Sequence, residues 1–425
     1  MKPTAIHLEQ QQSSAKTDNP ASDGRYSHLL DSLLNGLTIS LIKAPWWIAM
    51  LALVFSGPLS EYLGHATVYL IAGAVVSMAV VCFFSSWKGA IWIPQDVPTA
   101  ILLTISAKII AEIPPYITAE AQFATLIVAI AGTSILTGMA MFAVGCLQLG
   151  RLVCLIPFPV IAGFLGGTGY LLLIGGIQSS LAGQASMSAF DTESINYWAP
   201  CVVLALVMYG LGFWIKNALL IPVLMLLAIL VFFSASLLLG VSLEDLKAGG
   251  WLFSSIPQPT ASALLSSQHI DQIQWLTIRA QTDHIIMLVI GSVIAMLLNN
   301  GGFELAIKGQ FNHNKDLRIT GIANILGGMV GGWPGYISPA WSALNARQGH
   351  QLPLTGLIVA LSAGLLLWYA GPFLSICPRF VMASAIAYVG VSFLFKWVLF
   401  PPKRLSLMEY TILLGVAVLV ALSGL

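Results

Sequence analysis

The chain has 425 residues, of which 57% are hydrophobic and 8% are charged, and its formal net charge is +1. A typical soluble domain carries about 25% charged residues, so this composition excludes an ordinary soluble protein and indicates a membrane protein with several spans. The small net charge gives no support for a nucleic-acid partner or an acidic protein partner.

The five cysteines lie singly in apolar segments, without the short Cys and His spacings that are typical of metal sites. Because free cysteine is among the most buried residue types, we expect small buried side chains rather than disulfides or metal ligands. We expect no cofactor. The sequence has no HExxH, GxSxG or P-loop motif, so it does not indicate an enzyme.

A helix needs about 20 apolar residues to cross a bilayer, and this length divides the chain into thirteen predicted segments. The polar residues 1–28 are predicted to form a disordered cytoplasmic tail, and the polar stretch 241–282 an extracellular loop. The odd number of segments places the two chain ends on opposite sides of the membrane. The predicted segments are 30–56, 66–86, 98–112, 121–146, 157–177, 197–215, 218–240, 284–307, 317–332, 338–347, 354–371, 378–398 and 407–425.

Two proline-opened segments predict short helices that begin inside the bilayer. Asp96 lies between Pro94 and Pro98, and a segment rich in small residues begins near Pro339. Proline is tolerated at the first position of a helix, where its missing N–H would have no partner. A helix start offers free N–H groups and a positive dipole end, and irregular backbone survives at membrane depth only where it is buried or lines a cavity. We therefore expect these two half-helices to meet at a binding site.

Lysine and arginine residues in the connections set the predicted orientation, because cytoplasmic loops collect positive charge. With the N-terminus inside, twelve of these residues fall on the inner side and four on the outer side, and Lys43 and Lys308 remain within the membrane. We therefore predict a multi-pass protein of the plasma (inner) membrane with a cytoplasmic N-terminus. The four outer residues are Lys108, Lys247, Arg279 and Arg379.

A faint internal repeat relates the two halves of the chain. Residues 157–162 (PFPVIA) and 378–383 (PRFVMA) each open a span, and a half-helix precedes each of them in the same order. Chance similarity between apolar segments is the alternative for either pair alone. A first copy of seven spans inverts the second copy, which is the pattern of transporters with broken helices at the midplane. The predicted fold is therefore an all-α polytopic membrane protein with an inverted repeat.

Three sequence stretches resemble the SulP family of sulfate-permease and prestin-type anion transporters. They are residues 94–102 (PQDVPTAIL), 157–169 (PFPVIAGFLGGTG) and 342–349 (SALNARQG). Each stretch has moderate specificity alone, and the three together have high specificity. The similarity runs from about residue 28 to the end of the chain.

The resemblance implies a uracil-permease-like fold of fourteen segments in a 7+7 inverted repeat, with an anion held between the starts of segments 3 and 10. It also implies a core domain and a gate domain, a homodimer, and a cytoplasmic STAS domain after the last span. We expect a membrane portion whose last span and STAS domain are missing. The implied parts are the tail 1–28, core 29–146, gate 147–240, extracellular loop 241–282, core 283–371 and incomplete gate 372–425.

One position departs from the family pattern. Many family members carry an arginine in segment 10 just before the Ser-Ala-Leu-Asn stretch, and this chain has Trp341 there. The usual fixed positive charge beside the substrate is therefore absent, which leaves the selectivity for anions open.

The expected substrate site consists of residues at the starts of the two half-helices. Hydroxyl and amide side chains there offer hydrogen-bond donors to a bound oxyanion, although Ser338 is alternatively only an N-cap. Asp96 is either a site residue or an acid that satisfies N–H groups at the helix start. The complete predicted set is Gln95, Asp96, Thr99, Ala100, Ser338, Ala340, Trp341 and Ser342.

Lys43, Asp96, Glu304 and Lys308 are predicted to form a charge network within the membrane. Each such residue costs about 2.5–3.5 kcal/mol at mid-membrane, so they usually face a cavity and pair. By resemblance, Glu304 occupies the place of an acidic ion ligand in sodium-coupled relatives, and Lys308 lies one helical turn later. We hypothesise that Lys308 replaces a bound sodium ion and leaves coupling to protons on Glu304 or Asp96; an absolute sodium requirement would contradict this. The alternative is an ion pair that only stabilises the helix.

The sequence favours a secondary active transporter of a small inorganic anion, of the sulfate or bicarbonate class, that works by alternating access. A first alternative is a transporter of a cationic or zwitterionic solute such as a basic amino acid, bound by Asp96 and by the face of Trp341. A second alternative is an anion channel or sensor. Saturable uptake with counterflow distinguishes a carrier from a channel.

Overall fold

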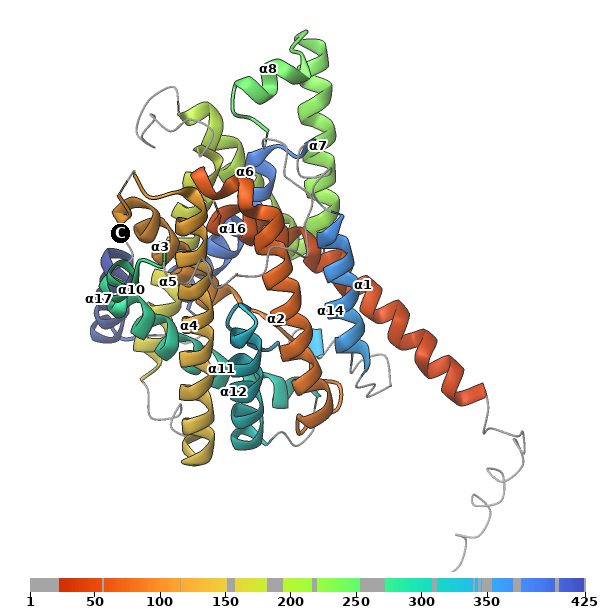
Figure 1. The fold of residues 1–425 in the computed structure, drawn as a ribbon, viewed down its shortest axis with the longest axis vertical. Coiled ribbons are helices and arrows are strands. Elements are labelled where there is room, and N and C mark those ends of the chain that lie inside the picture. The colour runs from red at the N-terminus through yellow and green to blue at the C-terminus, as the bar shows by residue number, and fades with distance from the viewer. Residues whose placement is uncertain are drawn as a thin grey trace, which may run out of the picture.

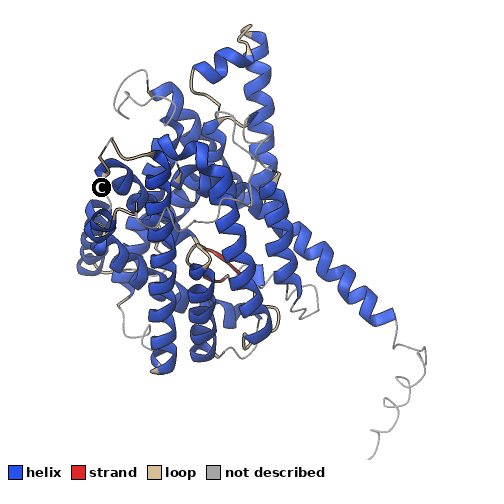
Figure 2. Cartoon of the chain, in the orientation of Figure 1, coloured by secondary structure: helices blue, strands red, loops and turns tan. Residues whose placement is uncertain are grey.

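A computed structural model defines the fold of the chain (Figure 1). It describes residues 23–55, 57–114, 116–150, 157–181, 194–215, 220–252, 272–307, 312–338, 341–342, 345, 354–369, 376–401 and 405–423. Most of these residues are helical, and a short pair of strands lies near the centre of the molecule (Figure 2). The long apolar segments form helices because a helix pairs its backbone polar groups within the segment, as the bilayer interior requires.

The helices of the first half begin and end close to the predicted spans. The largest difference is at the N-terminus, where the first helix begins at Asp23, inside the predicted tail 1–28. In chain order the elements are α1 (Asp23–Val54), the 3-10 helix η1 (Gly57–Tyr62), α2 (Leu63–Phe84), β1 (Trp92–Pro94), α3 (Asp96–Glu112), α4 (Ala119–Cys146), α5 (Phe158–Leu181), α6 (Ile195–Trp214) and α7 (Leu220–Leu238).

Two short helices lie within the predicted loop 241–282. The first, α8 (Leu243–Ala248), follows α7 at one end of the molecule (Figure 1) and begins with a capping box between Ser242 and Asp245. Hydrogen bonds from the hydroxyl and the backbone N–H of Ser242 hold the pKa of the Asp245 carboxyl below its usual value. The second, α10 (Trp275–Ala280), leads directly into the next long helix.

The second half follows the same order of elements. The predicted half-helix 338–347 is described at Trp341, Ser342 and Asn345, which are helical, and the N–H of Ser342 donates to the Ser338 carbonyl at 3.0 Å. The other elements are α11 (Thr282–Ile307), α12 (His313–Met329), β2 (Gly335–Ile337), α14 (Leu354–Trp368), α16 (Arg379–Phe393), the π-helix η4 (Leu394–Leu399) and α17 (Leu407–Ser423).

Seven helices of the described chain are long and apolar enough to cross a membrane, and α14 and α17 are shorter apolar helices. This finding supports the predicted multi-pass membrane protein. The first half-helix, α3, has 17 residues, fewer than the roughly 20 that cross a bilayer. A helix of that length is expected to begin or end inside the membrane.

The helices pack in two groups, and the packing repeats with the two halves exchanged. In the first group, α4 packs against α12, and α2 packs against α14. In the second group, α5 packs against α16, with α17 beside α5 and α6 beside α16. If α2 corresponds to α12, α4 to α14, α5 to α16 and α6 to α17, each contact has its image in the other half. This is the arrangement of a 7+7 inverted repeat.

Glycines allow close helix contact at one crossing in each group. Where α4 crosses α12, a Cβ on Gly138 would lie 2.5 Å from the carbonyl oxygen of Gly321, and a Cβ on Gly321 would lie 2.6 Å from that of Gly138. Where α5 crosses α16, Gly169 and Gly390 show the same reciprocal relation, at 2.9 and 2.6 Å. Because any larger residue would push the backbones apart, glycine sets the spacing of both pairs.

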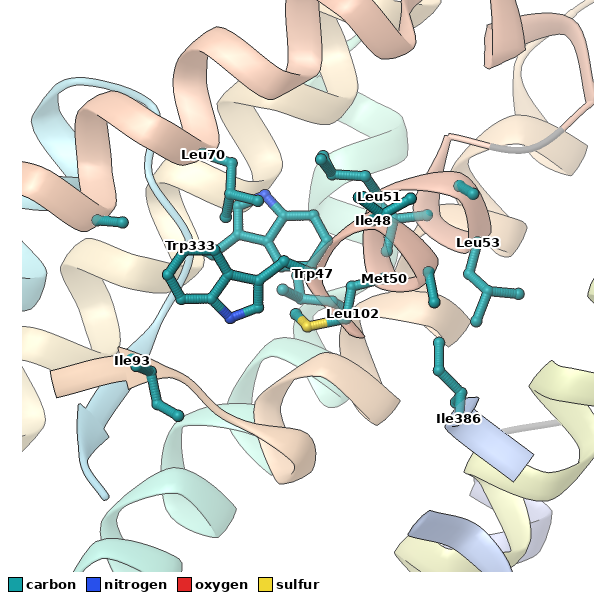
Figure 3. Packing of buried hydrophobic residues seen from close by; sticks show 14 of the residues in the cluster. Trp47, Ile48, Met50, Leu51, Leu53, Leu70, Ile93, Leu102, Trp333 and Ile386 are labelled. Carbon is teal, nitrogen blue, oxygen red and sulfur yellow. The ribbon is translucent and has the colours of Figure 1, made fainter. Parts of the chain in front are cut away.

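The main apolar core joins the first helix to the segment that leads into β2. Trp47 of α1 and Trp333 lie in the same cluster, with Met50 and Leu70 around them (Figure 3). The two tryptophans are 2% and 1% exposed. Their packing fixes the position of β2 relative to the first helix group.

Candidate functional site

Strands β1 and β2 form an antiparallel pair directly before the two half-helices. The sequence predicted proline-opened helices here, but the strands were not expected. Because β1 leads into α3 and β2 leads into Ser338, the positive ends of both half-helices lie at this pair. The paired residues are Trp92 with Ile337, Ile93 with Tyr336, and Pro94 with Gly335.

The first half-helix begins two residues earlier than the predicted start at Pro98. Gln95 is the N-cap, with an extended backbone at φ −115° and ψ 160°, and Asp96 is the first helical residue. Pro98 is therefore the third residue of α3, where a missing N–H still costs no helical hydrogen bond. The side-chain Nε2 of Gln95 donates to the carbonyl of Tyr336 at 3.0 Å. This bond ties the start of α3 to β2.

The second half-helix is tied to the residues before β1. The N–H of Ser338 donates to the Ile91 carbonyl at 2.8 Å. The hydroxyl of Ser342 accepts from the N–H of Ile91 at 2.9 Å, and the Asn345 side chain donates to the Gly89 carbonyl at 3.2 Å. Each half-helix start is thus held by backbone or side-chain bonds to the other half of the chain.

Asn324 is a positioning residue that sequence analysis missed. It lies in α12 and is 0% exposed. Its side-chain Nδ2 donates to the carbonyl of Gly335 at 2.7 Å, and its Oδ1 accepts from the N–H of Gly335 at 2.9 Å. One amide therefore pairs both backbone groups of the first residue of β2, on the side that does not face β1.

A cavity of about 550 Å³ lies beside the strand pair. One wall contains the start of α3, β2 and the second half of α11. The opposite wall contains α5, the end of α16 and η4. The lining residues are Gln95, Asp96, Val97, Leu165, Ala295, Leu298, Asn299, Tyr336, Ser338, Phe393, Lys396 and Trp397.

Three of the predicted site residues line this cavity. Gln95, Asp96 and Ser338 come from the two half-helix starts and lie on the same wall. Asp96 is partly buried, whereas Gln95 and Ser338 are 8% and 5% exposed. The structure thus brings together the acid and the polar groups that the sequence placed at two distant prolines.

Three other predicted residues lie behind the cavity wall. Thr99, Ala100 and Ser342 are at most 1% exposed and do not line the cavity. The hydroxyl of Thr99 donates to the Gln95 carbonyl, one turn earlier in the chain, at 2.6 Å. Thr99 therefore supports the start of α3, because its side chain lies one turn after Gln95 and points back toward it.

Lys43 lies between two tryptophans beside the site. Its Nζ is 4.4 Å from the ring centroid of Trp46 and 5.3 Å from that of Trp341. Both distances are in the range of cation–π interaction, and the charge of Lys43 also attracts that of Asp96. Trp341 therefore has a cation of the protein itself over its ring. Lys43 supplies a positive charge next to the position where the family resemblance implies an arginine.

The remaining predicted residues fall where the structure gives no side chain. Glu304 belongs to α11, but its side chain lies outside the described residues, as do Lys308 and Ala340. The predicted pair of Glu304 and Lys308 stays a prediction.

Most residues of the cavity lining were not predicted from the sequence. Asn299, on α11, is hydrogen-bonded to the side chain of Tyr336 on β2. Phe393, Lys396 and Trp397 come from the end of α16 and from η4. The pair of asparagines at 299–300 within an apolar helix was a signal that could have identified Asn299. Lys396 was counted only among the twelve lysines and arginines of the predicted inner side, and a π-helix has no pattern in the sequence that would have placed it at a site.

The cavity is suited to a solute that binds through hydrogen bonds and charge. Within the described ranges, no group of three or more His, Cys, Asp or Glu residues is arranged to hold a metal ion. The polar groups are two helix starts, an acid, two amides, the hydroxyls of Ser338 and Tyr336 and a lysine, and the rest of the lining is mainly apolar. This composition is typical of small-solute sites.

Comparison with known proteins gives one family for most of the chain. The sequence model of the sulfate permease family matches residues 29–416. The transmembrane domain of a cyanobacterial bicarbonate transporter, BicA, is a similar solved structure, with a TM-score of 0.68 and 21% sequence identity over 94% of this chain and 97% of that chain. That domain has the 7+7 inverted-repeat fold.

Two curated proteins with different transport substrates are similar in sequence. The vacuolar basic amino acid transporter VSB1 of Saccharomyces cerevisiae is 24% identical over 65% of this chain, and the match covers 28% of VSB1. The bicarbonate transporter BicA of Synechocystis is 26% identical over 86% of this chain, and the match covers 61% of BicA. The chain thus spans less than two thirds of the length of both relatives.

Proposed function

We propose that this chain, which belongs to the sulfate permease family, is a transporter. The proposed activity is secondary active transport of a small inorganic anion, of the sulfate or bicarbonate class, by alternating access. Family membership alone does not select the substrate, because the two curated relatives carry different solutes. The proposal therefore depends on the chemistry of the cavity.

The observation that carries the proposal is the cavity beside the β1–β2 pair. Two half-helices begin there, and the free N–H groups and positive dipole ends of helix starts favour anions. The amide of Gln95 and the hydroxyl of Ser338 lie on the same wall. A volume of about 550 Å³ is ample for a hydrated oxyanion.

Lys43 strengthens the positive character of this wall, and Asp96 weakens it. A carboxylate that faces the cavity repels an anion unless it is protonated or its charge is balanced by Lys43. We therefore propose that Asp96 binds a proton together with the anion, so that transport is coupled to protons. The proposal predicts full activity in sodium-free buffer.

The two helix groups provide a structural basis for alternating access. We infer that α1–α4 with α11, α12 and α14 form the core, and that α5–α7 with α16 and α17 form the gate. This division follows the segments 29–146, 147–240, 283–371 and 372–425. The cavity lies where the two groups meet, so movement of the core against the gate would expose the site to either side of the membrane.

Ligand binding to the purified protein, with sulfate, bicarbonate and arginine compared by thermal shift, tests the substrate class. We expect an inorganic anion to raise the melting temperature of the wild type, and Asp96→Asn to bind it as well or better. Asp96→Asn should also exchange anions across a proteoliposome membrane without accumulating them in a proton gradient. Asp283→Asn is the matched control, because Asp283 is an exposed acid in the first turn of α11, away from the cavity.

A basic amino acid is the second candidate substrate. It is favoured by the exposed face of Asp96 in the cavity and by the similarity to VSB1. Trp341 supports it less than the sequence suggested, because Lys43 lies over the ring. Stabilisation by arginine that Asp96→Asn abolishes, with no effect of anions, would establish this candidate and exclude the first.

A channel or sensor remains the alternative from a different class. Uptake that saturates and shows counterflow supports a carrier, and conductance that does not saturate supports a channel. We further propose that the protein lies in the plasma (inner) membrane as a homodimer with a cytoplasmic N-terminus. Protease or thiol labelling of intact and inverted vesicles tests the orientation, and cross-linking in the membrane tests the dimer.

A further inference from the structure

Helix α16 changes to a π-helix at its end, next to the cavity. The six residues of η4 continue α16 without a break, and the N–H of Phe400 donates to the carbonyl of Phe395, five residues earlier, at 2.8 Å. π-helical turns are rare and occur frequently at functional sites, because the extra residue rotates side chains out of the ordinary helical register. The side chains that follow Phe393 are therefore displaced from the positions that α-helical spacing would give.

The rotated segment places Lys396 between two cavities. The first is the cavity of about 550 Å³ that also contains Asp96 and Ser338. The second, of about 430 Å³, is lined by Tyr209, Phe213 and other residues of α6, α16 and η4. Among the described residues that line either cavity, Lys396 carries the one positive charge.

Lys396 is exposed, and its neighbour Trp397 limits its position without neutralising it. The Nζ lies 5.3 Å from the ring centroid of Trp397, so the ring face attracts the ammonium group but brings no negative charge. The lysine stem is flexible, and the head can therefore turn toward either cavity. Among the residues that the structure describes, no acidic side chain forms a salt bridge with Lys396.

Lys396 lies toward one side of the membrane. It comes at the end of α16, and Trp397 contacts Phe158, the first residue of α5, with ring centroids 6.1 Å apart. The predicted orientation puts the end of α16 and the start of α5 on the cytoplasmic side. An anion that enters from that side would meet Lys396 before it reaches Asp96 and Ser338.

We propose that Lys396 recruits the transported anion at the cytoplasmic mouth of the site. The inference rests on the proposed anion transport and names the residue that determines cytoplasmic affinity. Lys396 lies on the cavity wall formed by α5, α16 and η4, which belong to the proposed gate. Asp96 and Ser338 lie on the opposite wall. The effect of Lys396 is therefore confined to the state in which the cavity is open to the cytoplasm.

An exposed charge acts at a distance, and this gives the proposal a specific signature. Attraction between a lysine and an anion is screened within about 8 Å at physiological ionic strength and reaches farther at low salt. A recruiting charge raises the rate of encounter and lowers the apparent KM on its own side of the membrane. Because the gradients fix the transport equilibrium, the ratio of the maximal rates in the two directions changes by the same factor. A purely structural role would change stability or maximal rate and would not depend on salt.

Transport assays on proteoliposomes of defined orientation test the proposal with Lys396→Gln, Lys396→Arg and the control Lys315→Gln. Lys315 is an exposed lysine on the predicted cytoplasmic side, in the first turn of α12, and does not line either cavity. At low ionic strength we expect Lys396→Gln to raise the cytoplasmic KM for sulfate or bicarbonate by about three- to tenfold. The KM on the outer side should stay the same, and because the gradients alone fix the transport equilibrium, the ratio of the maximal rates in the two directions should shift by the same factor as the cytoplasmic KM. Lys396→Arg and Lys315→Gln should behave as wild type, and high salt should remove the difference.

Three results overturn the role of Lys396: an unchanged cytoplasmic KM in Lys396→Gln, an equal change on both sides of the membrane, or a change that persists at high salt. A lower KM in Lys396→Gln also overturns it and points to a cationic substrate, because removal of a positive charge would then help recruitment. The failure of the proposed function looks different, since wild-type protein would then show no saturable anion uptake from either side.

Discussion

The two walls of the cavity are built by different forces. The wall with Gln95, Asp96 and Ser338 is held by hydrogen bonds. Those of Gln95 and Ser342 cross between the halves of the chain, and those of Asn324 hold β2 within the second half. The opposite wall, with Leu165 and the residues of α16 and η4, presents mainly apolar side chains and one lysine. The first wall is bonded to its surroundings in a directional way, and the second is held mainly by packing.

This difference suggests that one wall binds the solute and the other moves during transport. Directional bonds fix the polar groups within a few tenths of an ångström, which binding of a small solute requires. Apolar contacts have no preferred register, so one surface can slide past another at little cost. We therefore expect substitutions on the bonded wall to change affinity, and substitutions of the apolar residues on the packed wall to change the rate of the conformational step.

The largest expected effect is that of Asn324→Leu, which removes both bonds to Gly335. A buried backbone group without a partner costs about 1–3 kcal/mol, and this variant leaves two of them. We expect a clear loss of thermal stability in detergent and at least about a tenfold loss of substrate affinity. Asn312→Ala, at the exposed cap of the same helix, should cost only about 1 kcal/mol and leave affinity intact. Wild-type affinity in Asn324→Leu would mean that β2 does not position the site.

Lys43→Met is expected to have an intermediate effect. It removes the positive charge beside Asp96 and retains much of the stem that packs on Trp46 and Trp341. Anion affinity should fall by roughly three- to tenfold, because the carboxylate is no longer balanced. Lys88→Met removes an exposed lysine outside the cavity and serves as the control. Unchanged anion binding, or stronger binding of arginine alone, would contradict an anion site on this wall.

The smallest effect on affinity should come from Leu165→Val on the packed wall. The change removes one methylene group, worth about 0.8 kcal/mol of burial, and no hydrogen bond. Affinity should stay within about twofold of wild type, while the maximal transport rate shifts. Leu171→Val, on the same helix but outside this cavity, is the matched control. An affinity loss of more than about fivefold would show that the packed wall also binds substrate.

The lengths of the apolar segments predicted the long helices of the fold correctly. Predicted span 121–146 corresponds to α4 (Ala119–Cys146), and 284–307 corresponds to α11 (Thr282–Ile307). The membrane imposes this agreement, because an element inside it must be both apolar and internally hydrogen-bonded. The start of α3 was placed two residues late, since Gln95 takes the N-cap position and Asp96 follows it. Proline marks the first turn of a helix but not its first residue.

The candidate site was predictable only in its helix starts. Gln95, Asp96 and Ser338 meet because each lies next to a proline-opened helix, which the sequence displays. The contributions of Asn324, Tyr336 and Lys396 depend on strand pairing and on a π-turn, and neither has a periodic signal. Thr99 was expected in the site as a hydrogen-bond donor near the helix start, and its hydroxyl instead bonds back to Gln95. Proximity along a helix does not specify which face a residue occupies.

The strand pair links the helix starts of the two halves of the chain directly to each other. A displacement of β1 by one residue would move β2 with it, because Ile93 and Tyr336 sit opposite each other at the centre of the pair. Substitutions in either strand should therefore be strongly non-additive in double-mutant cycles, even where the two positions are far apart in sequence. A substitution at one helix start is therefore expected to affect the position of the other helix start as well.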